Sequence, residues 1–162
     1  MKEVNFYIKK ELDFLQKNLN CYLQYWPINI DQVNNTTYSL LELASHLYTL
    51  PAAYCALFNG IPEDDLLKLW GGPWNYKSID DFREILDKGM TEIMSHKFLS
   101  MRDEILIPWT FGNPISAREH CVNLITHMYH HRGQMHLLLK QAGAKIDTGT
   151  IYMTSEGRWR TD

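Results

Sequence analysis

The sequence lacks the features that mark membrane proteins and nucleic-acid-binding proteins. No apolar run approaches the roughly 18 residues that a membrane-spanning helix needs. The net charge is −3 and the lysines and arginines are scattered, so there is no positive stripe for nucleic acid or an anionic membrane. Acids and lysines interrupt the apolar pattern of the first residues, which is unlike a signal peptide. These absences predict a protein that binds neither nucleic acid nor membrane.

Cysteine is also scarce. The three cysteines, Cys21, Cys55 and Cys121, lie far apart within helical patterns and are odd in number. Their spacing argues against a disulfide framework and against a Cys-x-x-Cys metal site, and it is typical of proteins from a reducing compartment. A cytoplasmic location is therefore expected.

The chain of 162 residues, 45% of them hydrophobic, is long enough for one globular core. Four segments repeat apolar residues at helical spacing, and no segment of comparable length alternates as a strand does. The apolar stripe of the first segment consists of Ile8, Leu12, Leu15, Leu19 and Leu23. This helix should end before Trp26-Pro27, because the residue before a proline avoids the helical conformation. We expect one all-α domain over residues 1–162, with a polar C-terminal tail from about residue 144.

The other three helices each begin with a serine that is followed three residues later by an acid, which is the pattern of a capping box. The pairs are Ser39 with Glu42, Ser78 with Asp81, and Ser116 with Glu119. Gly60 and Gly143 are placed to end the second and the fourth helix. Pro51 removes a hydrogen bond to the carbonyl of Leu47, which predicts a local distortion of the second helix.

The connections favour a four-helix bundle with a long crossover. About twenty residues join the second helix to the third, too many for a hairpin, and residues 66–70 suggest a short helix within them. Trp70, Trp74 and Tyr76 in this connection either shape the mouth of a pocket or pack onto the end of the bundle. Residues 105–113 are expected to form a short extended excursion before the last helix.

Four of the seven histidines fall between residues 127 and 136. His127 and His131 are four residues apart, so on a helix their imidazoles lie side by side on one face. That face also carries Leu124 and Leu138, which must turn inward. Two imidazoles on adjacent turns can chelate one divalent cation, although the glutamate that follows the first histidine in zinc proteases is absent.

His46 is the natural third ligand, since it lies between Leu43 and Leu47 on the apolar side of the second helix. A neutral histidine placed there needs a partner for its ring nitrogens, and an ordinary hydrogen-bonded core histidine is the alternative interpretation. Three histidine ligands would leave a divalent metal with an open position for water or substrate. A di-iron carboxylate site is disfavoured because Glu42 precedes His46 by four residues rather than three.

The remaining polar residues near this motif have less specific patterns. His120 lies seven residues before His127 and is a reserve ligand. His130 points about 100° away from His131 on the helix. It is expected to orient a ligand, to lie in an interface or to face solvent. Asn123 and Tyr129 are candidates to orient a ligand. Arg132 could recognise a substrate carboxylate, but a surface or interface salt bridge is the favoured interpretation. His136 and His96 have no distinguishing context.

Two stretches resemble a known family. Residues 39–47, which end in His46-Leu47, resemble the helix-2 histidine motif of the DinB/YfiT-like metalloenzymes. Residues 129–134, followed by Gly143, resemble the helix-4 signature of that family, with His127 four residues before His131. The resemblance extends over roughly residues 5–143. Nothing in the sequence supports the DNA binding that the family name suggests.

The resemblance implies a four-helix bundle, commonly a homodimer, with His46, His127 and His131 as ligands of nickel, zinc or a similar divalent ion. Some relatives are thiol S-transferases that use mycothiol or bacillithiol, and a related branch includes a maleylpyruvate isomerase. The first hypothesis is therefore a metal-dependent thiol S-transferase or hydrolase with a small-molecule substrate. The alternative is a non-enzymatic metal-binding or stress-related dimeric module, because no side chain stands out as a general acid or base.

Overall fold

A computed structural model of the chain describes residues 2–26, 39–71, 78–101, 103–109, 112–154 and 157–158. Most of these residues are helical, which confirms the all-α prediction. The helices are α1 (Lys2–Tyr22), α2 (Leu40–Phe58), α3 (Glu63–Gly71), α4 (Ile79–Ile93), α5 (His96–Leu99) and α6 (Ala117–Gln141), with 3-10 helices η1 (Leu23–Tyr25) and η3 (Thr148–Tyr152). Two short antiparallel pairs join β1 (Leu106–Ile107) to β2 (Ile115–Ser116) and β3 (Met153–Thr154) to β4 (Gly157–Arg158). Among the described residues, no helix is long and apolar enough to cross a membrane.

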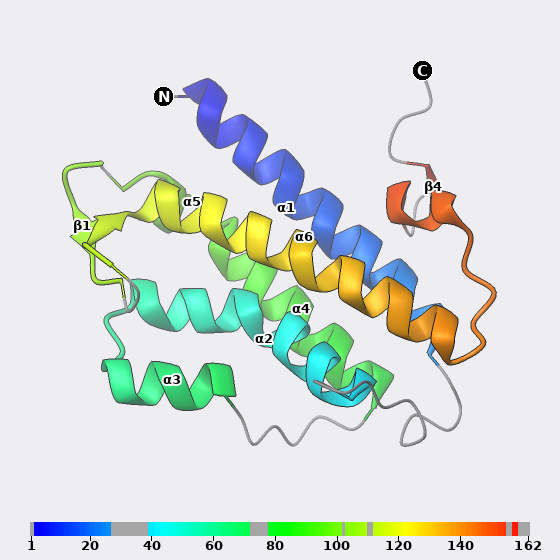
Figure 1. Cartoon of the computed structure of the whole chain (residues 1–162). Helices are drawn as coiled ribbons and strands as arrows, with labels where there is room; N and C mark the ends of the chain where they lie inside the picture. The colour runs from blue at the N-terminus through cyan, green and yellow to red at the C-terminus, as the bar shows by residue number, and fades with distance from the viewer. Residues whose placement is uncertain are drawn as a thin grey trace.

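The long helices pack side by side around one core. In Figure 1, α6 runs between α1 and α2, and α2 packs most extensively against α4. The apolar stripe predicted for the first helix faces inward: Leu12, Leu15 and Leu19 are fully buried. The Tyr48 hydroxyl of α2 donates a hydrogen bond to the Leu19 carbonyl at 2.7 Å, and so joins α2 to α1 inside the core.

The predicted helix starts are present. Ser39, Ser78 and Ser116 are the N-caps of α2, α4 and α6, and each forms a reciprocal capping box with the acid three residues later. Gly60 and Gly143 have φ values of +79° and +86°, the left-handed conformation expected after a helix end. The second helix continues through Pro51 as far as Phe58. The starts of these three helices are thus set by local side-chain chemistry.

The connections follow the predictions where they are described. Helix α3 lies within the connection between α2 and α4 and packs on α2, while residues 72–77 and the side chain of Trp70 fall outside the described part of the chain. The proposed roles of Trp70, Trp74 and Tyr76 therefore remain predictions. The expected excursion at residues 105–113 contains β1 and precedes β2, which runs directly into α6.

The C-terminal segment is more ordered than the predicted polar tail. Residues 148–154 form η3 and β3 and pack along α1. The buried side-chain amide of Asn18 donates to the carbonyls of Thr150 and Met153. Because a buried amide without partners is costly, these two bonds fix the segment onto α1.

Helices α2 and α4 approach each other most closely where Gly89 faces Pro51. A Cβ atom at position 89 would lie 2.7 Å from the Ala52 amide nitrogen and 2.9 Å from the Pro51 Cβ. The Cys55 thiol also donates to the Gly89 carbonyl, at 3.5 Å. The close packing of α2 on α4 therefore requires glycine at this position, whereas Gly133, exposed on α6, meets no atom within 4 Å.

We expect opposite effects from alanine at these two helical glycines. Gly89→Ala should lower the free energy of unfolding by about 1–3 kcal/mol because the backbone of α2 must move. Gly133→Ala should raise it by up to about 1 kcal/mol, since alanine favours the helix and the added methyl group meets open space. Urea unfolding of the two variants and the wild type measures both changes. A Gly89→Ala protein as stable as the wild type would contradict the packing argument.

Candidate metal centre

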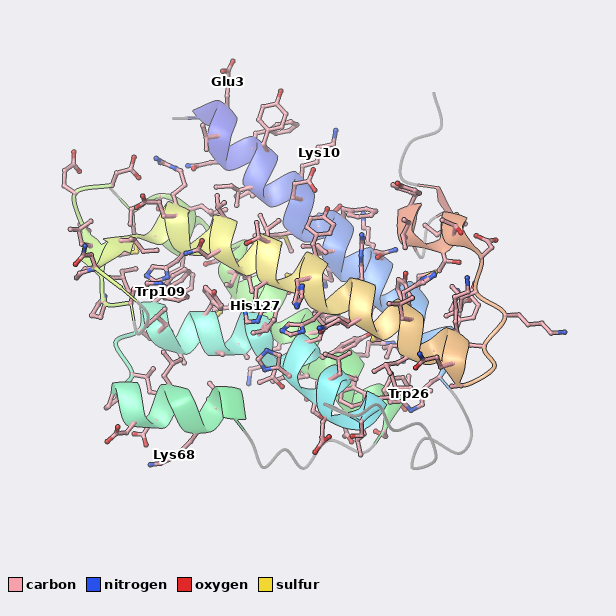
Figure 2. All side chains as sticks on the ribbon, viewed as in Figure 1. Glu3, Lys10, Trp26, Lys68, Trp109 and His127 are labelled. Carbon is pink, nitrogen blue, oxygen red and sulfur yellow. The ribbon has the colours of Figure 1, made fainter. Side chains whose placement is uncertain are left out.

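Two of the predicted ligands lie on adjacent turns of α6. The Nε2 atoms of His127 and His131 are 2.8 Å apart and their ring centroids are 4.6 Å apart. Figure 2 shows the His127 side chain projecting from α6 toward α2. The four-residue spacing thus places both imidazoles side by side, on the inner side of the helix.

His46 comes to the same place from α2. Its Nε2 atom lies 3.3 Å from the Nε2 atom of His127, and its ring centroid is 4.7 Å from that of His131. One ring nitrogen from each of the three histidines falls within 4.8 Å of the others. The structure therefore brings together the three residues that the sequence singled out, and it places His46 beside the pair.

The spacing of the nitrogens suits a divalent ion. Zinc–nitrogen bonds are roughly 2.0–2.1 Å long, so two nitrogens on one ion are separated by about 2.9 Å at a right angle and about 3.4 Å at the tetrahedral angle. The distances of 2.8 Å and 3.3 Å that involve the His127 Nε2 atom correspond to these two values. His127 is thus spaced from each of the other two histidines as two ligands of one ion would be, and the nitrogens of all three lie within 4.8 Å of one another.

Burial keeps the pair on α6 unprotonated. The loss of solvent, together with the neighbouring rings of His131, His46 and His130, lowers the pKa of His127 to about 4. Burial also lowers the pKa of His131, although a hydrogen bond to Gln134 acts in the opposite direction. A metal ion needs the lone pair of a neutral imidazole, so the site offers ligands in the required state at neutral pH.

Gln134 is a functional candidate that sequence reasoning missed. Its Oε1 atom lies 2.7 Å from the Nδ1 atom of His131, on the opposite side of the ring from the Nε2 atom that faces His127. Gln134 belongs to the helix-4 signature, but its position three residues after a histidine does not distinguish it from a glutamine that faces solvent.

The other histidines are placed elsewhere. His120, the reserve ligand, is fully buried against Trp109, with ring centroids 5.0 Å apart, and does not belong to the three-histidine group. His130 is exposed, and its ring centroid lies 5.0 Å from that of His131. The Nδ1 atom of His136 is 2.8 Å from the Tyr22 hydroxyl, and the side chain of His96 is not described.

Arg132 points into the protein, which corrects the surface salt bridge favoured from the sequence. Its guanidinium donates to the Asn18 Oδ1 atom and to the Ile151 carbonyl, each at 3.1 Å, and lies 4.6 Å from the ring centroid of Tyr129. The Tyr129 hydroxyl donates to Glu11 on α1 at 2.6 Å. Both residues therefore bind α6 to α1 and the C-terminal segment. Asn123 is half-buried one turn before His127, and its role in orienting a ligand stays a prediction.

The low pKa of His127 predicts that acid destabilises the metal-free protein. Its value falls from 6.5 to about 4 on folding, so the unfolded chain binds a proton more readily. The stability gained from the neutral ring is present above pH 6.5 and is lost as the pH falls toward 4. Metal-free His127→Gln should therefore lose less stability than the wild type between about pH 7 and about pH 5 in urea unfolding. An identical loss in both proteins would contradict this; Gln141→Leu, at an exposed position on the same helix, is the control.

Comparisons with known proteins agree with this fold. The model of the DinB family matches residues 29–159. The crystal structure of a proposed DinB family member from Exiguobacterium sibiricum 255-15 matches with a TM-score of 0.74 and 18% sequence identity, covering 93% of this chain and 99% of that chain. At this identity the structural match shows a shared fold. No curated protein matches the chain. The family match extends over most of the sequence and includes all three histidines, so the chain belongs to the DinB family.

Proposed function

We propose that the protein binds one divalent metal ion through His46, His127 and His131 and uses it as an enzyme. The observation that carries this proposal is the convergence of three imidazole nitrogens within 4.8 Å, from two helices that are far apart in the sequence. The depressed pKa of His127 and of His131 supports it, because neutral rings compete well for a cation.

The reaction class that this site supports best is thiol S-transfer. A divalent ion, when bound, stabilises the deprotonated form of a thiol or of water near neutral pH. The sulfur then forms a bond to an electrophilic carbon of the second substrate, while the bond from that carbon to its leaving group breaks. The thiol proton is released to the solvent when the thiolate forms, and the leaving group departs with its bonding electron pair as an anion, so atoms and charge balance. The substrate is a low-molecular-weight thiol of the bacillithiol or mycothiol type.

Hydrolysis is the closest alternative reaction at the same three ligands. Zinc proteases carry a glutamate directly after the first histidine as general base. Here that position is the fully buried Met128, which cannot accept a proton. A thiol gives up its proton more easily than water, with pKa values of about 8.5 and about 15.7, so it depends less on such a base. This difference favours the transferase over the hydrolase.

Zinc or nickel is the proposed ion. Imidazole nitrogens suit both, and the ligand set contains no thiolate, since Cys21, Cys55 and Cys121 are buried elsewhere in the core and absent from the three-histidine group. We further propose that α1, α2, α4 and α6 form the four-helix bundle expected of the family, with residues 59–78 as its crossover, and that the protein is a cytoplasmic homodimer.

A non-enzymatic metal-binding or stress-related dimeric module is the second candidate function. It is favoured by the surroundings of the pair on α6: the groups that shift the pKa of His127 and His131 are other histidines and Gln134, with no carboxylate to act as a base. Selective metal binding that changes the assembly state, without turnover of any thiol substrate, would favour this candidate.

The ligand assignment predicts the metal content of natively purified protein. Elemental analysis should find about one zinc or nickel ion per chain in the wild type. His46→Ala and His131→Ala should each weaken binding by more than the roughly 10- to 100-fold that the loss of an outer-shell partner costs. His130→Ala, at an exposed position on the same helix, is the matched control and should keep the metal. Stoichiometric metal in both ligand variants would overturn the assignment.

The transferase proposal predicts metal-dependent conjugation of a thiol. Protein loaded with zinc or nickel should join bacillithiol or mycothiol to 1-chloro-2,4-dinitrobenzene, with release of chloride, faster than the free ion does. Chelation of the metal, or His131→Ala, should reduce the rate to the uncatalysed background because the thiol then keeps its proton. Formation of the conjugate is followed by absorbance. A metal-loaded protein without turnover of either thiol would exclude this reaction and leave metal binding intact.

A further inference from the structure

The contact between Gln134 and His131 determines which nitrogen of His131 carries a proton. A neutral imidazole has one N–H donor and one lone-pair acceptor, and the hydrogen bond made by one nitrogen fixes the state of the other. The Gln134 Oε1 atom can only accept, and it lies 2.7 Å from the His131 Nδ1 atom. The proton therefore sits on Nδ1, and the lone pair of Nε2 faces His127.

We propose that Gln134 is the positioning residue that presents the His131 Nε2 atom as a ready-made metal ligand; this rests on the proposed metal binding. The residue lies three positions after His131, so the same turn of α6 supplies the ligand and its partner. Both side chains are half-buried, which limits competition from water for the hydrogen bond.

Gln134 is an uncharged partner for His131. Metal-binding histidines usually donate to a carboxylate, a backbone carbonyl or water, and a carboxylate makes the ring a stronger donor and adds a negative charge. Gln134 supplies the same acceptor geometry without that charge. It therefore orients His131 without itself lowering the positive charge of a bound ion.

The experiment compares three variants with the wild type. Gln134→Leu removes the acceptor, Gln134→Glu keeps an acceptor at the same place, and Gln141→Leu makes the same change at an exposed glutamine at the end of α6. Zinc affinity is measured by competition with a chromophoric chelator. Two-dimensional nitrogen NMR of the metal-free proteins, at mildly alkaline pH, identifies the protonated nitrogen of each histidine.

Gln134→Leu should bind zinc about 10- to 100-fold more weakly, Gln134→Glu should bind it at least as tightly as the wild type, and Gln141→Leu should match the wild type. The wild-type spectrum should show the hydrogen of His131 on Nδ1. A hydrogen on the His131 Nε2 atom in the wild type, or an unchanged zinc affinity in Gln134→Leu, would overturn the proposal. A wild type that binds no zinc would instead refute the proposed function, and the metal-free spectrum would still report the state of His131.

Discussion

The packing of α6 against α2 holds the Nε2 atoms of His46 and His127 3.3 Å apart, and the properties of the site depend on this contact. Rings at that distance cannot all carry a charge, because like charges repel strongly where water is excluded. The fold therefore favours the neutral form of His127 and His131, which is also the state that a metal ion needs. Helix α2 is held from its other side by α4, where the absence of a side chain at Gly89 allows close contact with Pro51.

Helix α6 is fixed independently by α1. His131 and Arg132 are adjacent in sequence and point about 100° apart, so one faces α2 and the other faces α1. Hydrogen bonds from Arg132 to Asn18 and from Tyr129 to Glu11 join the two helices on the side away from the three histidines. Since Asn18 and Arg132 also bind the carbonyls of residues 150–153, the C-terminal segment contributes to the placement of α6. A segment remote from the histidines thus helps to position them.

Local signals in the sequence predicted the helix starts and the histidine pair on α6, because a capping box and a four-residue spacing act within one or two turns. The partnership of His46 with that pair depends on how two helices pack, which spacing within one helix does not encode; the family resemblance supplied it. The packing role of Gly89 was missed and Arg132 was misplaced at the surface for the same reason, because their partners lie on other helices. Gln134 is different: its partner is local, but glutamine is common on solvated helix faces.

The neutral surroundings of the histidines bear on the choice between thiol and water as the nucleophile. A carboxylate beside the ligands would supply a base, which would help to activate water. The groups acting on His127 and His131 include only histidines and an amide, so no such base is available from them. A bound divalent ion stabilises either anion, but a thiol gives up its proton more easily than water does. The lack of a carboxylate among these groups leaves them without a general base. This favours a thiol as the nucleophile, because a thiol depends less on such a base than water does.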